Sequence, residues 1–93
     1  MYPKYKFEIV TMDSLAYSAE DVESVIMPAA KGYLGVLKGH MPYVTRLSGG
    51  VISVKRDAAA AVSDKEWNIT GGFAKILADS VTIFADRLEE KKL

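Results

Sequence analysis

The 93-residue chain contains no cysteine and a single histidine, His40. The lack of cysteine excludes disulfide bonds and thiolate chemistry. With one imidazole and no thiolate, the chain also lacks the ligands of a structural zinc site. No dense cluster of Asp, Glu and Gly residues offers a site for a harder cation. We therefore expect no metal site and no cofactor.

Neither positive nor negative charge is in excess. The chain has 12 basic and 12 acidic residues, and both kinds are spread evenly along it. A nucleic-acid-binding domain would instead carry a basic stripe, so nucleic acid is not an expected partner. No apolar run typical of a signal peptide opens the chain, and none approaches the roughly 18 residues of a transmembrane helix. We expect a soluble protein that stays in the cytoplasm.

The dominant sequence pattern has a period of two, which is typical of half-buried strands. Residues 5–10 read YKFEIV and place Tyr5, Phe7 and Ile9 on one face. Further short alternating segments follow, separated by glycine-rich turns, and no helical pattern of 10–15 residues intervenes. The sequence predicts an all-β chain, a flattened antiparallel sandwich or barrel of about ten short strands.

Two segments depart from this pattern. Residues 57–62 read DAAAAV, and four alanines are too few to nucleate a helix, so we interpret them as the distal part of a long hairpin. Residues 86–93 read DRLEEKKL, which has the composition of a helix, and we expect a single helical turn there. The chain thus divides into a β-sandwich domain at residues 1–86 and a short charged tail at residues 87–93.

Aromatic residues fall into two groups. Five lie at strand periods and are expected mostly in the core: Tyr5, Phe7, Trp67, Phe73 and Phe84. Tyr33 is expected in a turn, where a large aromatic residue more often contacts a partner. Tyr43 directly follows a proline and fits either group.

The segment 31–42, KGYLGVLKGHMP, is the most irregular part of the chain. It is not a phosphate-binding loop, because its lysine precedes Gly39 and a Met-Pro pair follows in place of a helix. None of the seven serines lies in the Gly-x-Ser-x-Gly elbow of a hydrolase. His40 as a general base for one of them is an alternative. The simpler reading is a polar turn residue, and we predict no catalytic residue.

Several short motifs follow one another in a distinctive order. They are Gly32-x-Leu34-Gly35-Val36, Gly39-His40-x-Pro42, Thr70-Gly71-Gly72-Phe73 and the final VTIFAD. In order and spacing, from about Tyr5 to Asp86, they resemble the N-terminal domain of the epsilon subunit of the rotary F-type ATP synthase, called delta in mitochondria.

The resemblance implies a ten-stranded β-sandwich that performs no chemistry. It would be a rotor subunit of the central stalk, bound to the gamma subunit and to the c-subunit ring, and would touch the alpha/beta hexamer only indirectly. The complex couples proton or sodium flow to ATP synthesis. The subunit would be peripheral, held through the complex at the cytoplasmic face of a bacterial inner membrane.

The resemblance also implies contact residues. The loop matching Lys31, Gly32 and Tyr33 would meet the c ring, and the turn carrying His40 would lie near both the ring and gamma. We assign the gamma contact to five residues, because apolar side chains at edges and turns indicate a partner: Thr11, Met12, His40, Met41 and Tyr43.

Two features depart from the family. Many members carry an acidic residue where Tyr33 stands. The family usually adds a two-helix hairpin after the sandwich, and residues 87–93 are too short to form one. We expect that hairpin, with its inhibitory role and its nucleotide site, to be absent.

Another class of protein remains as an alternative. A free-standing β-sandwich recognition module would bind a peptide or glycan through its loops. Sugar sites usually align several exposed aromatic residues, and only Tyr33 and Tyr43 are candidates here.

Overall fold

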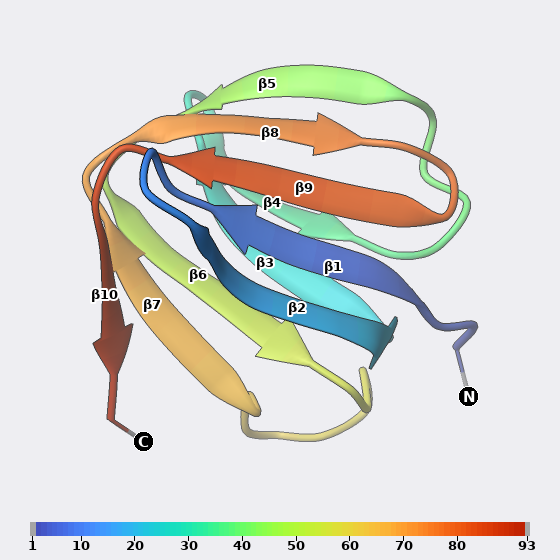
Figure 1. Cartoon of the computed structure of the whole chain (residues 1–93). Helices are drawn as coiled ribbons and strands as arrows, with labels where there is room; N and C mark the ends of the chain where they lie inside the picture. Colours follow the sequence, from blue (N-terminus) through green and yellow to red (C-terminus); the bar gives the residue numbers. More distant parts are fainter. Residues whose placement is uncertain (1, 93) are drawn as a thin grey trace.

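The computed structural model describes residues 2–92, and within this range it contains ten β-strands and no helix, so none that could cross a membrane (Figure 1). This confirms the prediction of an all-β chain with about ten short strands. The strands are β1 (Tyr5–Val10), β2 (Leu15–Val22), β3 (Ser24–Ala29), β4 (Gly32–Val36), β5 (Tyr43–Leu47), β6 (Gly50–Lys55), β7 (Lys65–Ile69), β8 (Gly72–Ile76), β9 (Ser80–Ala85) and β10 (Leu88–Lys91).

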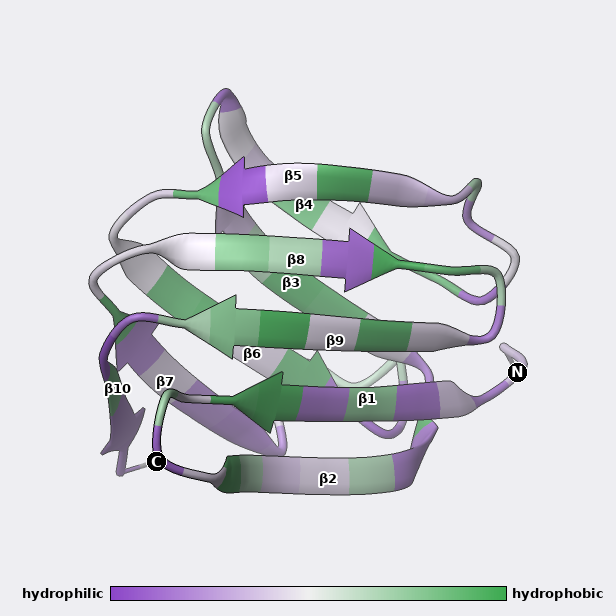
Figure 2. Ribbon diagram, turned by 45° about the horizontal axis from the view of Figure 1, so that its top comes forward, coloured by the Kyte–Doolittle hydropathy of each residue, from purple (hydrophilic) through white to green (hydrophobic). Residues whose placement is uncertain are grey.

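The strands form one curled sheet that folds over into two layers. The front layer, seen face-on in Figure 2, has the order β5-β8-β9-β1-β2. The back layer has the order β10-β7-β6-β3, with β4 paired to β3. A bridge between Ala29 of β3 and Leu47 of β5 joins the layers on one side. On the other side, the ring of Tyr17 packs 4.8 Å from that of Trp67, between centroids.

The core lies between the two layers and follows the predicted alternation. On β1, the side chains of Tyr5, Phe7 and Ile9 are buried. Ile52 and Val54 of β6 are fully buried from the opposite layer. Burying one such side chain stabilises the fold by about 1.5–3 kcal/mol before the entropy of ordering it is counted.

One pair of strands departs from the antiparallel prediction. Strand β1 runs parallel to β9, with Lys6 opposite Ser80 and Val10 opposite Phe84, whereas the other pairs are antiparallel. The alternation along a strand fixes which side chains point inward, but it carries no information on the direction of the neighbouring strand. The parallel pair places the ends of β1 and β9 at the same end of the sandwich.

The tail is also different from the prediction, because residues 88–91 form strand β10 and not a helical turn. The strand pairs antiparallel with β7, with Glu90 opposite Trp67. Two ion pairs link the strands. Nζ of Lys65 lies 3.5 Å from Oε1 of Glu90, and Nζ of Lys91 lies 3.6 Å from Oε1 of Glu66. So short a segment cannot sustain an isolated helix, whereas β7 offers a free edge whose charges complement it.

The long hairpin between β6 and β7 is confirmed, and residues 57–63 form its irregular tip. Glu23 anchors this tip and is the one charged residue that is buried among residues 2–92. Its Oε1 accepts a hydrogen bond from the Ala58 N–H at 2.9 Å, and its Oε2 lies 3.8 Å from Nζ of Lys4. The carboxylate is therefore paired on both oxygens, as burial of a charge requires.

The assignment of aromatic residues to the core is only partly correct. Tyr5, Phe7 and Trp67 are buried as predicted. Phe73 is 48% exposed, and Phe84 is only partly buried. The reason is that β8 directs Ala74 inward, so that Phe73 points away from the core.

Candidate interaction surface

A row of apolar side chains crosses the outer face of the front layer. Phe73 of β8 lies opposite Phe84 of β9, and Phe84 lies opposite Val10 of β1. Val10 in turn lies opposite Leu15 of β2, next to a register shift. Because residues directly opposite each other share a face, these four side chains form a continuous row across four strands.

The row is extended at both ends. On β5, Val44 lies opposite Lys75, two residues from Phe73, and so occupies the diagonal neighbour position. At the other end, Met12 lies in the β1–β2 turn and is 98% exposed. We call the resulting set the apolar band, and it consists of Val10, Met12, Leu15, Val44, Phe73 and Phe84.

The geometry of the band suits contact with another protein. The rings of Phe73 and Phe84 are stacked, with centroids 4.9 Å apart and planes at 24°. A shallow hollow of about 370 Å³ lies beside them, and its lining includes Met12 and Asp86. Contiguous exposed apolar surface of this kind typically marks an interaction site, whereas single exposed apolar residues do not.

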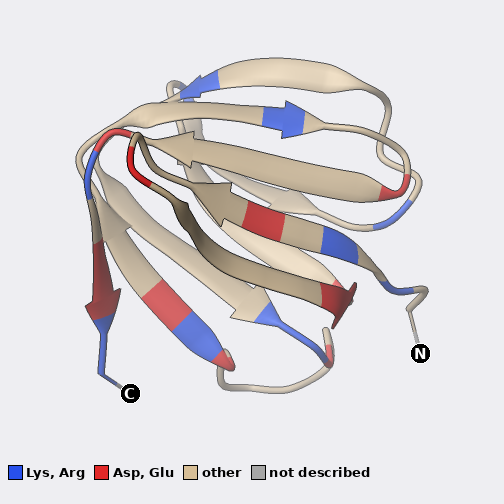
Figure 3. Cartoon of the chain, viewed as in Figure 1, with Lys and Arg blue, Asp and Glu red and all other residues tan. Residues whose placement is uncertain are grey.

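Basic residues alternate with the band on β5 and β8. Arg46 lies opposite Phe73, and Lys75 lies opposite Val44, so that two cations and two apolar side chains form a checkerboard. These two strands carry basic segments and no acidic one (Figure 3). Within residues 2–92, neither Arg46 nor Lys75 forms an ion pair.

His40 lies in the loop of residues 37–42, which connects β4 to β5. The Gly39 N–H donates to the Ala78 carbonyl at 2.7 Å, which fixes this loop beside the β8–β9 turn. The His40 Nδ1 atom lies 2.8 Å from the Met41 carbonyl oxygen, and its ring centroid is 6.5 Å from that of Tyr43. Met41 and Tyr43 are exposed, so the loop adds apolar surface at this end.

The residues predicted to contact gamma lie at opposite ends of the front layer. Thr11 follows β1 and therefore lies beside the end of β9, because these strands are parallel. His40 lies near Ala78, just before β9 begins. A strand of six residues, about 20 Å, separates them. The apolar band connects the two ends across the face, from Val44 beside Tyr43 to Met12.

Most members of the band were not predicted as contact residues, because such residues were expected in turns and at edges. Five members lie within strands: Val10, Leu15, Val44, Phe73 and Phe84. The sequence does carry one sign of a covered outer face. Residues 81–85 of β9 are apolar on both faces of the strand, apart from Thr82. Such a strand is typical of a sheet that is covered on both faces.

The residues predicted to contact the c ring are also separated. Lys31 lies in the β3–β4 turn, and Gly32 and Tyr33 begin β4, so Tyr33 is in a strand and not in a turn. Tyr33 is 62% exposed, and its hydroxyl accepts a hydrogen bond from the Val51 N–H at 3.2 Å. His40 follows the opposite end of β4 and is thus apart from the other three.

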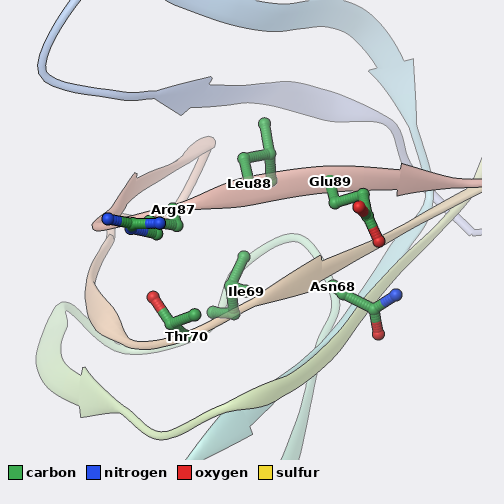
Figure 4. Close-up of a pocket in the computed structure, with 6 residues that line it drawn as sticks. All are labelled: Asn68, Ile69, Thr70, Arg87, Leu88 and Glu89. Carbon is green, nitrogen blue, oxygen red and sulfur yellow. The ribbon is translucent and has the colours of Figure 1, made fainter.

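A further hollow, of about 360 Å³, lies between β7 and β10 (Figure 4). Its lining is mixed and holds one guanidinium, Arg87, and one carboxylate, Glu89. No group of three or more His, Cys, Asp or Glu side chains that could hold a metal occurs in the described part of the chain. The apolar band thus remains the candidate interaction surface.

Comparison with known sequences gives consistent matches. Residues 4–91 match the family described as the ATP synthase, Delta/Epsilon chain, beta-sandwich domain. The ATP synthase epsilon chain of Koribacter versatilis is 41% identical over 90 residues, covering 96% of this chain and 59% of the relative. That of Bacillus velezensis is 38% identical over 84 residues, covering 90% and 60%. The chain thus spans about three fifths of the length of these relatives.

Two solved structures share the fold. A chain in the mitochondrial ATP synthase of Euglena gracilis, solved as OSCP/F1/c-ring, superposes with a TM-score of 0.82 at 23% identity, covering 97% of this chain and 56% of that one. A chain of the central stalk/c-ring of the Tetrahymena thermophila enzyme gives a TM-score of 0.74 at 13% identity, covering 95% and 67%.

Proposed function

Because the chain belongs to the family of ATP synthase delta/epsilon chain β-sandwich domains, we propose that it is a non-catalytic rotor subunit of the central stalk of an F-type ATP synthase. The family assignment rests on residues 4–91, which include all ten strands. In this proposal the chain transmits rotation through surface contacts and makes or breaks no bond.

The apolar band is the proposed binding surface for the gamma subunit, and its exposed apolar side chains are the observation that supports this assignment. The band runs from the Thr11–Met12 turn to the start of β5 at Tyr43, beside the loop that carries His40 and Met41, so one partner could reach both ends of the front layer. Covering this face would remove exposed apolar area from water, at about 25 cal/mol per Å². His40, which the resemblance placed near both partners, belongs with gamma in this arrangement.

The c-subunit ring is the second proposed partner, and the corner formed by Lys31, Gly32 and Tyr33 is its proposed contact. This corner lies on the back layer, away from the outer face of the front layer, and so remains available when gamma is bound. Tyr33 is exposed there, while its hydroxyl is held by the backbone of β6. A rigid contact residue of this kind suits a joint that must carry torque.

Within the complex, the chain would turn with gamma and the ring as proton or sodium flow drives ATP synthesis. It would contact the alpha/beta hexamer only indirectly. Curated relatives include bacterial epsilon chains, which supports a place at the cytoplasmic face of a bacterial inner membrane. The membrane association would be peripheral and would arise through the complex.

Binding to gamma provides the direct test. The chain and the gamma subunit of the same organism are mixed at micromolar concentration and analysed by size-exclusion chromatography and titration calorimetry. We expect a one-to-one complex that Phe73→Ser weakens at least tenfold, or about 1.4 kcal/mol, since aromatic residues at the centre of an interface dominate binding.

Val62→Ser is the matched control, because Val62 is also apolar and 70% exposed but lies in the β6–β7 loop, outside the band. It should leave the dissociation constant unchanged. A wild-type chain that elutes alone at these concentrations would contradict the proposed function. Equal losses for the two variants would show that gamma binds elsewhere.

A further inference from the structure

We propose that the partner surface covering the apolar band is acidic, with carboxylates that face Arg46 and Lys75. This inference rests on the proposed function and adds the chemistry of the partner to it. It concerns the checkerboard on β5 and β8, where each of the two cations lies directly opposite an apolar side chain of the band.

The two cations lie within or directly beside any interface that includes the band. Residues opposite each other on neighbouring strands have Cβ atoms about 5 Å apart, so a partner that covers Phe73 and Val44 also covers Arg46 and Lys75. Removing a charge from water without an opposite charge costs several kcal/mol. A purely apolar or basic partner would therefore lose part of what the band contributes to binding.

Among residues 2–92, no carboxylate forms an ion pair with either cation. Glu8, on the same face, lies two strands away from Lys75, with Thr82 between them, and its Oε2 is 3.8 Å from Nζ of Lys6. Asp86 lines the same hollow as Arg46, but the two form none of the ion pairs found in the described part of the chain. The compensating charge must then come from the partner.

Association kinetics test the inference, with the gamma subunit of the same organism as the probe. The rate constant is measured by stopped flow from about 20 to 500 mM salt, because surface charge affects association more than dissociation. For the wild type we expect the rate constant to fall as salt increases. For Arg46→Glu/Lys75→Glu we expect it to fall roughly tenfold or more at low salt and to rise with salt.

Arg87→Glu/Lys92→Glu is the matched control, because neither residue belongs to a proposed contact and both are exposed. It alters the net charge by the same four units, since each double variant replaces two basic residues by two acidic ones, but it changes residues outside the front layer. Its rate constant at low salt should stay within about threefold of the wild type. Circular dichroism and urea unfolding verify that both double variants are folded.

The outcomes separate the inference from the proposed function. If the wild type does not bind gamma at all, the proposed function fails. If gamma binds and Phe73→Ser weakens binding, but the two double variants associate at the same rate, the docking surface stands and the acidic partner is wrong. Faster association of Arg46→Glu/Lys75→Glu than of the control would indicate a basic partner and would also overturn the inference.

Discussion

The inner and outer faces of β8 and β9 are both rich in apolar side chains, yet they differ in what covers them. On the inner face, Ala74, Ile76 and Ile83 are fully buried against the back layer. On the outer face, Phe73 and Phe84 stack on each other and remain partly exposed. Apolar character alone therefore does not distinguish a residue that stabilises the fold from one that binds a partner.

Charge is what distinguishes the two faces. The inner face of these strands carries no charged residue, whereas Lys75 and the neighbouring Arg46 alternate with the aromatic residues outside. A permanently buried face cannot accommodate such cations, but a face that is solvated before it meets a partner can. The outer face thus resembles the core of a protein interface with a polar surround.

The largest loss of stability is expected from a substitution at Gly72 of β8, which lies against the backbone of β9. A Cβ at Gly72 would clash with the Phe84 carbonyl oxygen, and Gly72 has a φ of +144°. Strain and overpacking should together lower the unfolding free energy of Gly72→Ala by about 4 kcal/mol or more. Urea denaturation measures this loss.

Gly35→Ala provides the comparison, because a Cβ there meets no atom within 4 Å. The loss should be under about 1 kcal/mol. Similar losses for the two variants would mean that β8 and β9 are not in close contact at this point.

The second prediction compares the two faces directly. Ile83→Ala removes three carbons from the fully buried inner face and should cost about 3 kcal/mol of unfolding free energy, through lost transfer energy and a cavity. Phe73→Ala removes more atoms from the outer face, yet should cost less than about 1 kcal/mol in the isolated chain. Urea denaturation of both variants checks this order, and a reversed order would place Phe73 in the core.

The sequence predicts this structure well where the local pattern determines burial and strand formation. It predicts the structure poorly where tertiary contacts determine them. Alternation at residues 5–10 predicts the buried face of β1, because one of its faces is polar. It fails for Phe84, because β9 is apolar on both faces apart from Thr82. Phe73 was also assigned to the core, although it shares the outer face of β8 with Lys75. The local pattern also fails for the tail, where helical composition is overridden by pairing with β7.

The candidate surface is harder to predict than the fold, for a geometric reason. Thr11 and Met12 are recognisable from the sequence as turn residues, and so are His40 and Met41. Nothing in the spacing shows that they lie at the two ends of one layer, because that depends on β1 and β9 being parallel neighbours. Residues that join them, such as Phe84, are identified only once the register is known.

The smallest loss of stability is expected from removing the buried hydroxyl of Tyr5 on the inner face. This variant tests whether water is excluded from that face. The Tyr5 hydroxyl donates to the Val36 carbonyl at 2.8 Å, so Tyr5→Phe should cost about 1 kcal/mol at pH 7. Burial raises the pKa of the Tyr5 hydroxyl well above its ordinary value of about 10. The folded state therefore keeps a proton that the unfolded state releases above pH 10.

Above pH 10, the wild type should accordingly lose stability, by up to about 1.4 kcal/mol per pH unit, from this group alone. Tyr5→Phe lacks the group, so its deficit relative to the wild type should shrink between pH 10 and pH 11 and then reverse. Unfolding free energies at pH 7, 10 and 11 measure the change. Tyr43→Phe is the control, because Tyr43 is an exposed tyrosine, and it should cost less than about 0.5 kcal/mol at pH 7. A deficit of Tyr5→Phe that stays constant with pH would show that water reaches the inner face at β1, and the contrast between the two faces would then be one of degree.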